Sequence, residues 1–257
     1  MTITGRAGRA SGIPMDPLRR TACLAGVLYL ATFASSIPAR FFFLDPVLSD
    51  PQYILGSGDG TRVVIGGVLD MVNALACIGT AVVLFTVVKR QNETLALGFV
   101  TSRVLEAAII SVGVVSLIAV VTLRQDVARP AGAEDASLVT VGASLVAVHG
   151  WTFLFGPDVM AGINALLLGS LMYRSGLVPR VIPLLGLIGG PLLLASVTGI
   201  VFSTHDLDSG LHVIAAAPIF LWALSLGVWL VIKGFRPSPV TAAVTSSVEV
   251  SADLSRA

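Results

Sequence analysis

Ionisable side chains inside long apolar stretches are the residues of this sequence that could do chemistry. Asp70, Arg103 and Glu106 all lie within such stretches. A charged group at the centre of a bilayer is costly, so it usually faces protein or water and has a partner or a task. These three residues are therefore the first candidates for a functional site.

One helical face of the second apolar stretch carries polar groups at steps of three and four residues: Asp70, Asn73, Cys77 and Thr80. We expect this face to point toward protein or water and not toward lipid. A carboxyl group without a partner in a medium of low dielectric constant tends to take up a proton. Asp70 is thus predicted either to handle protons or to hydrogen-bond between helices in its protonated form.

Arg103 and Glu106 are three residues apart on the third apolar stretch, close enough to pair along one helix face. The chain turns near Gln91, so residues at equal distances from this turn lie at the same depth. Glu106 should then lie level with Cys77 and about one turn from Asn73. The candidate site therefore comprises Asp70, Asn73, Arg103 and Glu106, unless the charged pair only stabilises the bundle.

Three secondary candidates, Asp158, His149 and His212, are expected near the outer ends of helices. Asp158 and His149, with Trp151 nearby, are where an enzyme acting on a lipid or a quinone would have its site. The alternative is that Asp158 is hydrated or caps the helix after Pro157. The sequence leaves both interpretations open.

Motifs for metals, nucleotides and covalent nucleophiles do not occur in the sequence. Cys23 and Cys77 lie in apolar segments without CxxC or Cys/His spacing, which indicates neither a disulfide framework nor a zinc site. His205, Asp206 and Asp208 match no metal-binding spacing. We expect no cofactor and no metal, and a non-enzymatic function is favoured.

The composition requires lipid around the chain. Hydrophobic residues make up 55% and charged residues 12% of the sequence, with a mean hydropathy of +0.91, whereas soluble domains carry about 25% charged residues. The net charge of +1 provides no basic surface for nucleic acid. The expected partner is the lipid bilayer, while protein partners and a homo-oligomer stay open.

Apolar runs long enough to cross about 30 Å of hydrocarbon predict an all-α, polytopic transmembrane bundle of six spans. The fourth run is too long for one straight helix and contains Gly156 and Pro157, so residues 137–156 are predicted either to precede a kink or to form a separate interfacial element. The runs are Thr21–Phe43, Val63–Val88, Thr94–Leu123, Leu138–Tyr173, Val181–Phe202 and Leu211–Ile232.

Small residues indicate where the helices approach one another closely. They recur after Pro157 and in the fifth run, at Ala161, Gly162, Ala165, Gly169, Gly186 and Gly190. The transmembrane domain is predicted over residues 19–235, with disordered tails at 1–18 and 236–257.

The distribution of Lys and Arg predicts the orientation. If both termini are cytoplasmic (N-in/C-in), the cytoplasmic flanks hold ten of these residues and the outer loops hold four. Positively charged flanks resist translocation. We therefore expect both termini on the cytoplasmic side.

Three strings resemble a family of bacterial multi-pass membrane proteins of unknown function, DUF4386. They are AGVLYLATFASSIPA (Ala25–Ala39), SRVLEAAIISVG (Ser102–Gly113) and LLLGSLMYRSGLVPRVIPLLGLIGG (Leu166–Gly190). The resemblance implies a helical bundle in a bacterial inner membrane, and it implies no activity, cofactor or catalytic residue.

Three classes of function follow from these patterns. The favoured one is small-solute or proton-coupled transport through the polar site between helices two and three. A non-catalytic scaffold or sensor is the alternative, and a lipid- or quinone-modifying enzyme is the least favoured.

Overall fold

The protein is a bundle of membrane-spanning helices. The computed structural model describes residues 16–56, 60–126 and 135–239, and every regular element in these ranges is a helix. Six helical segments are long and apolar enough to cross a membrane, which confirms the predicted fold class and the six spans. Most of the two predicted tails lies outside the described residues.

The described helical segments follow the predicted apolar runs closely. In chain order they are α1 (Pro17–Pro38), η1 (Ala39–Phe43), α2 (Asp45–Ser49), η2 (Tyr53–Leu55), α3 (Thr61–Val88), α4 (Glu93–Asp126), α5 (Asp135–Phe153), η3 (Leu154–Met160), α6 (Ala161–Ser175), α7 (Val181–Val201) and α8 (Gly210–Ile232).

Local chemistry explains the helix ends. α1 begins four residues before the predicted run because Asp16 accepts a hydrogen bond from Leu18 N and a proline occupies the first helical position. α6 ends at Gly176, whose φ of 67° only glycine adopts without strain. Ser209 caps α8 by accepting a hydrogen bond from His212 N, which fixes His212 in the first turn.

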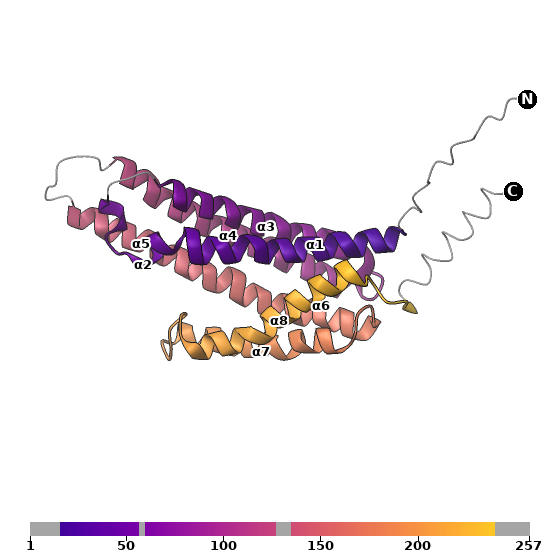
Figure 1. The fold of residues 1–257 in the computed structure, drawn as a ribbon. Helices are drawn as coiled ribbons and strands as arrows, with labels where there is room; N and C mark the ends of the chain where they lie inside the picture. Colours follow the sequence, from indigo (N-terminus) through magenta and orange to yellow (C-terminus); the bar gives the residue numbers. More distant parts are fainter. Residues whose placement is uncertain (1–15, 57–59, 127–134, 240–257) are drawn as a thin grey trace, which may run out of the picture.

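The spans form a closed sequence of neighbours (Figure 1). α3 and α4 form a hairpin, α1 lies along α3, and the α5–α6 segment follows α4. α6 packs on α7, α7 on α8, and α8 returns to α1. α1 and α8 meet closely at the end that carries the termini, where a Cβ on Gly26 would lie 2.7 Å from Gly227 O. The polar faces of α3 and α4 border the space that these helices enclose.

The fourth span decides between the possibilities left open for residues 137–156, which do not form a separate element. Residues 136–175 form one helical span of 40 residues, and its middle part, η3, is a π-helix. Pro157 lacks an N–H and its ring clashes with the carbonyl four residues earlier, so the wider π turn accommodates it without a break. A helix of this length is about 60 Å long, about twice the hydrocarbon thickness. One end of the α4–α5 pair accordingly extends beyond the turn between α7 and α8 (Figure 1).

Small residues mark the close helix contacts, as predicted. A Cβ on Gly190 would lie 2.9 Å from Gly162 O, so α6 and α7 touch along their backbones. Gly186 likewise lies directly against the ring of Trp222 on α8.

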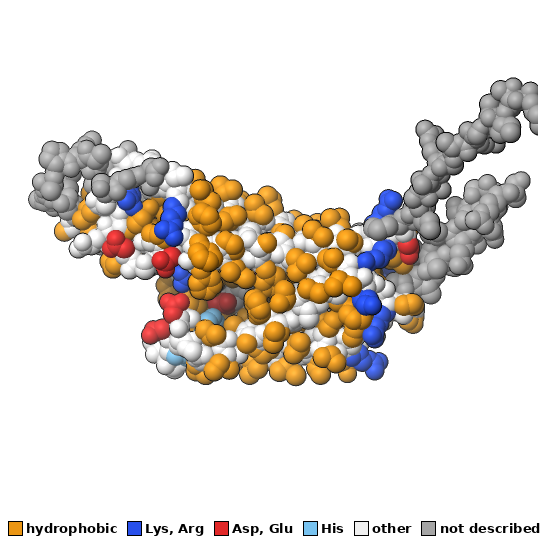
Figure 2. Space-filling model, viewed as in Figure 1, with side chains coloured by type: hydrophobic (Ala, Val, Ile, Leu, Met, Phe, Trp, Pro, Cys, Tyr) orange, Lys and Arg blue, Asp and Glu red, His pale blue; other side chains and the backbone are white. Residues whose placement is uncertain are grey.

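The surface separates lipid-facing from polar regions (Figure 2). Large apolar side chains cover the middle of the bundle, and many of those on α3, α4, α7 and α8 are exposed. Lys and Arg gather at the end from which the termini leave, and Asp and Glu gather mainly at the opposite end.

Candidate functional site

The predicted ion pair between Arg103 and Glu106 is present inside the bundle. Arg103 Nη1 donates to Glu106 Oε2 at 3.1 Å, and both side chains are buried. The guanidinium also lies over the Tyr29 ring of α1, 5.2 Å from its centroid. The aromatic face partly compensates the buried positive charge.

Glu106 is the centre of a small hydrogen-bonded network. Asn164 Nδ2 on α6 donates to Glu106 Oε2 at 2.7 Å, and Cys77 Sγ on α3 lies 3.8 Å from Glu106 Oε1. The contact with Cys77 confirms the depth expected from the α3–α4 hairpin. Asn73 joins the network through Cys77, whose sulfur lies 3.9 Å from Asn73 Oδ1. Three helices therefore hold this carboxylate in place.

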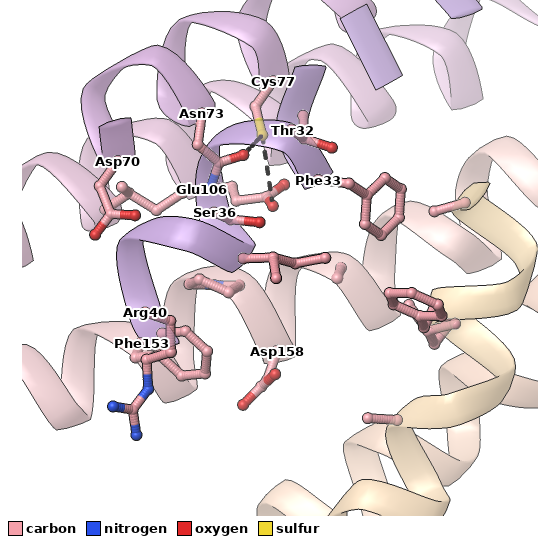
Figure 3. Close-up of a pocket in the computed structure, with 18 of the residues that line it drawn as sticks. Thr32, Phe33, Ser36, Arg40, Asp70, Asn73, Cys77, Glu106, Phe153 and Asp158 are labelled. Atoms are coloured by element: carbon pink, nitrogen blue, oxygen red, sulfur yellow. Dashed lines mark hydrogen bonds between the residues drawn. The ribbon is translucent and has the colours of Figure 1, made fainter. Parts of the chain in front are cut away.

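Asp70 lies apart from that network, about one helical turn from Asn73 and two from Cys77 along α3 (Figure 3). It has no hydrogen bond and no ion pair with the described part of the chain, and Arg40 of η1 is the charged group whose field reaches it. Asp70 is half-buried. The sequence argument that Arg103 pairs with Glu106 and leaves Asp70 unpaired agrees with this geometry.

A cavity of about 600 Å³ connects all four primary candidates. Its walls come from α1, η1, α3, α4, α5, η3, α6 and α8, so the candidate site is larger than the gap between helices two and three. Figure 3 shows Asp158 entering from the wall opposite to the one that carries Asp70, Asn73 and Cys77. Exposed Phe41 and Asp208 also line the cavity and mark its mouth, at the end away from the termini.

Asn164 Oδ1 and Trp222 Nε1 are among the buried polar atoms of cavity-lining residues that have no hydrogen-bond partner in the described part of the chain. Their side chains are only 1% and 2% exposed. Buried polar groups are nearly always hydrogen-bonded, so unpaired polar atoms in residues of this wall are an exception to the packing of the bundle.

The secondary candidates Asp158 and His212 form a second polar cluster. His212 Nε2 lies 3.3 Å from Asp158 Oδ2, and its Nδ1 lies 3.1 Å from Ser196 Oγ of α7. Ser196 Oγ is also 3.0 Å from Nε2 of half-buried His205, whose Nδ1 lies 3.1 Å from Thr204 Oγ1. A chain of polar groups thus connects the α7–α8 turn with the cavity wall.

His149 lines the same cavity but lies outside this cluster. Its Nδ1 lies 3.4 Å from Gly113 O of α4. Trp151, which the enzyme interpretation placed beside it, is 49% exposed and stacks on Phe155. The described residues contain no group of three or more His, Cys, Asp or Glu side chains that could hold a metal ion.

Sequence reasoning missed Asn164, which joins α6 to Glu106, and Ser196, which lies between His205 and His212. Asn164 lies three residues after Ala161 on the stripe of small residues, and an amide there is the one signal that could have indicated a buried polar contact. Ser196 gives no such signal, because a serine is common in membrane helices and its two histidine partners lie in another segment.

A family model described as "Domain of unknown function (DUF4386)" matches residues 24–234. The chain belongs to the DUF4386 family. The matched region contains the whole DUF4386 cavity, from Tyr29 on α1 to Ala223 on α8. No curated protein and no solved structure matches the chain. The function of this DUF4386 protein must therefore be inferred from the cavity.

Proposed function

We propose that the protein moves a small solute across a bacterial inner membrane in a proton-coupled manner, with the cavity as its binding chamber. The observation that supports this proposal is the cavity itself, because it connects Asp70, Asn73, Arg103 and Glu106 within the membrane-spanning region. Ionisable residues at that depth mark ion pathways and proton relays in membrane proteins. A purely structural ion pair would need no such space beside it.

The two groups of polar residues have different roles in this proposal. Arg103 and Asn164 both donate to Glu106 Oε2, and the three side chains form a fixed polar floor. Asp70 and Asp158 have no Lys or Arg within ion-pair distance among the described residues, so these carboxyl groups are free to gain and lose protons. The fixed floor positions the solute, and the two carboxyl groups couple its binding to protons.

The orientation completes the proposal. With both termini in the cytoplasm, the Lys- and Arg-rich end faces inward, in agreement with the positive-inside rule. The cavity then opens outward in this conformation, since Phe41 and Asp208 lie at the other end. Transport requires a second conformation that opens toward the termini.

Flux measurements in proteoliposomes test this function. Liposomes that contain the purified protein and an internal pH indicator are challenged with a panel of amino acids, amines, sugars and organic anions under a pH gradient. We expect at least one solute class to change the proton flux. The Asp70→Asn variant should abolish the change, and Asp45→Asn, an exposed carboxylate outside the cavity, should preserve it. An Asp70→Asn flux equal to that of the wild type would contradict the role of Asp70.

A further inference from the structure

The described residues that line the cavity carry more carboxyl groups than guanidinium groups. The carboxyl groups are those of Asp70, Glu106, Asp158 and Asp208, and the guanidinium groups are those of Arg40 and Arg103; His149 and His212 also line the wall. Each guanidinium has a carboxylate partner: Arg103 lies 3.1 Å from Glu106 and Arg40 lies 3.4 Å from Asp208. An anionic solute would therefore find no free guanidinium group on these walls. Of the carboxyl groups in the described part of the chain, Asp70 has no ion pair, and Asp158 has only His212, which is charged only if it is protonated.

The rest of the wall suits a cation that carries apolar groups. Rings of Phe33, Phe220 and Trp222 line the cavity beside Tyr29, whose ring already holds the Arg103 guanidinium, and Phe33 and Phe220 pack edge to face with centroids 5.1 Å apart. Aromatic faces attract organic cations.

We propose that the cavity binds an organic cation with apolar substituents, and that Asp70 and Asp158 on opposite walls are its counter-ions. This solute class rests on the proposed transport function. A neutral carboxyl group in an apolar cavity needs no counter-ion, and a cation that enters needs a carboxylate. The cation and the proton therefore compete for the same carboxyl groups, so the protein would exchange cations for protons across the membrane.

The polar cluster behind Asp158 offers a path for the displaced proton. When the cation arrives, the Asp158 carboxyl proton passes to His212 Nε2, while the proton on His212 Nδ1 passes to Ser196 Oγ. The Ser196 hydroxyl proton moves to His205 Nε2, and the proton on His205 Nδ1 leaves to water at the exposed turn. One proton leaves by this path when the Asp158 carboxylate forms, and the proton lost by half-buried Asp70 leaves through the open cavity that it lines. The other titratable groups facing the cavity from the described elements around it are Tyr29, Arg40, Asp70, Cys77, Arg103, Glu106, His149 and Asp208.

Binding of a hydrophobic cation tests the solute class. Radiolabelled tetraphenylphosphonium is titrated onto the full chain in lipid nanodiscs, with empty nanodiscs subtracted, and its isosteric anion tetraphenylborate is the matched probe. We expect saturable binding of the cation alone, weakened at least tenfold by Asp158→Asn and by Asp70→Asn and unchanged by Asp45→Asn. The smaller tetraethylammonium ion extends the test if the larger probe does not fit.

Two outcomes would overturn the proposal: binding of neither cation, or equal binding of the anion. Solute flux in the liposome panel without cation binding would refute the solute class and leave the transport function intact.

The proton path is tested separately by stopped-flow proton release on cation binding. Ser196→Ala should slow this release at least tenfold at unchanged affinity, and Ser196→Thr, which keeps a hydroxyl, should restore it; an unchanged rate in Ser196→Ala would refute the path.

Discussion

Replacing either member of the Arg103–Glu106 pair should destabilise the bundle to a different extent. Glu106→Gln leaves the Arg103 guanidinium buried without a counter-ion, and an arginine side chain cannot lose its proton. Arg103→Met leaves a carboxyl group that can become neutral by taking up a proton and still accept the hydrogen bond from Asn164. The loss of free energy of unfolding should therefore be larger for Glu106→Gln.

The magnitudes follow from the burial of the pair. The two side chains are 7% and 5% exposed, and removing one partner of such a pair typically costs about 3–5 kcal/mol. We expect this range for Glu106→Gln. For Arg103→Met we expect about 1–3 kcal/mol, the cost of a buried polar group that has lost a hydrogen bond. The double variant should be more stable than Glu106→Gln alone, because no unpaired charge remains.

Reversible unfolding in mixed micelles, followed by circular dichroism, measures these differences. Its control is Glu93→Gln, a replacement in the exposed first turn of α4, for which we expect a change below about 0.5 kcal/mol. Additive losses in the double variant, or a larger loss for Arg103→Met than for Glu106→Gln, would refute the reasoning.

Three further predictions concern packing and orientation. Gly26→Leu should separate α1 from α8 and cost about 1–3 kcal/mol in the same unfolding assay, whereas Gly150→Ala, with no atom within 4 Å, should cost little. Arg19→Gln removes hydrogen bonds to the last carbonyls of α8 and should cost about 1–2 kcal/mol, with exposed Arg20→Gln as its control. Single cysteines are introduced into a variant without native cysteines, and intact cells are treated with a thiol reagent that does not cross the membrane. A cysteine in the α7–α8 turn should react and one in the α3–α4 turn should not; the reverse would contradict the proposed orientation.

The sequence predicts the spans well because length and hydropathy alone decide them. It also places Arg103 beside Glu106 and at the level of Cys77, since both follow from helix geometry and one short turn. These predictions need no knowledge of how distant helices face one another. They therefore hold for contacts within one helix or one hairpin.

Contacts between distant helices could not be predicted in this way. α7 and α8 are apolar on all sides, so their sequences do not show which face points inward. The approach of Ser196 to His205 and His212 depends on that rotation and on the turn between the helices. Likewise, Pro157 indicates a disturbed helix but not that a π turn would absorb it and keep the span continuous.

The native thiol of Cys77 gives the most direct test of the central claim that a water-accessible, cation-preferring cavity reaches the buried polar network. Cys77 lines the cavity beside Glu106, and Cys23 is the chain's other cysteine and can be replaced by serine. Two methanethiosulfonate reagents, one with a trimethylammonium and one with a sulfonate group, are compared on this variant in proteoliposomes. Their rates are normalised to those for a free thiol. Modification of Cys77 with a normalised preference for the cationic reagent is the expected result; a thiol that neither reagent modifies until the protein is unfolded would contradict the account.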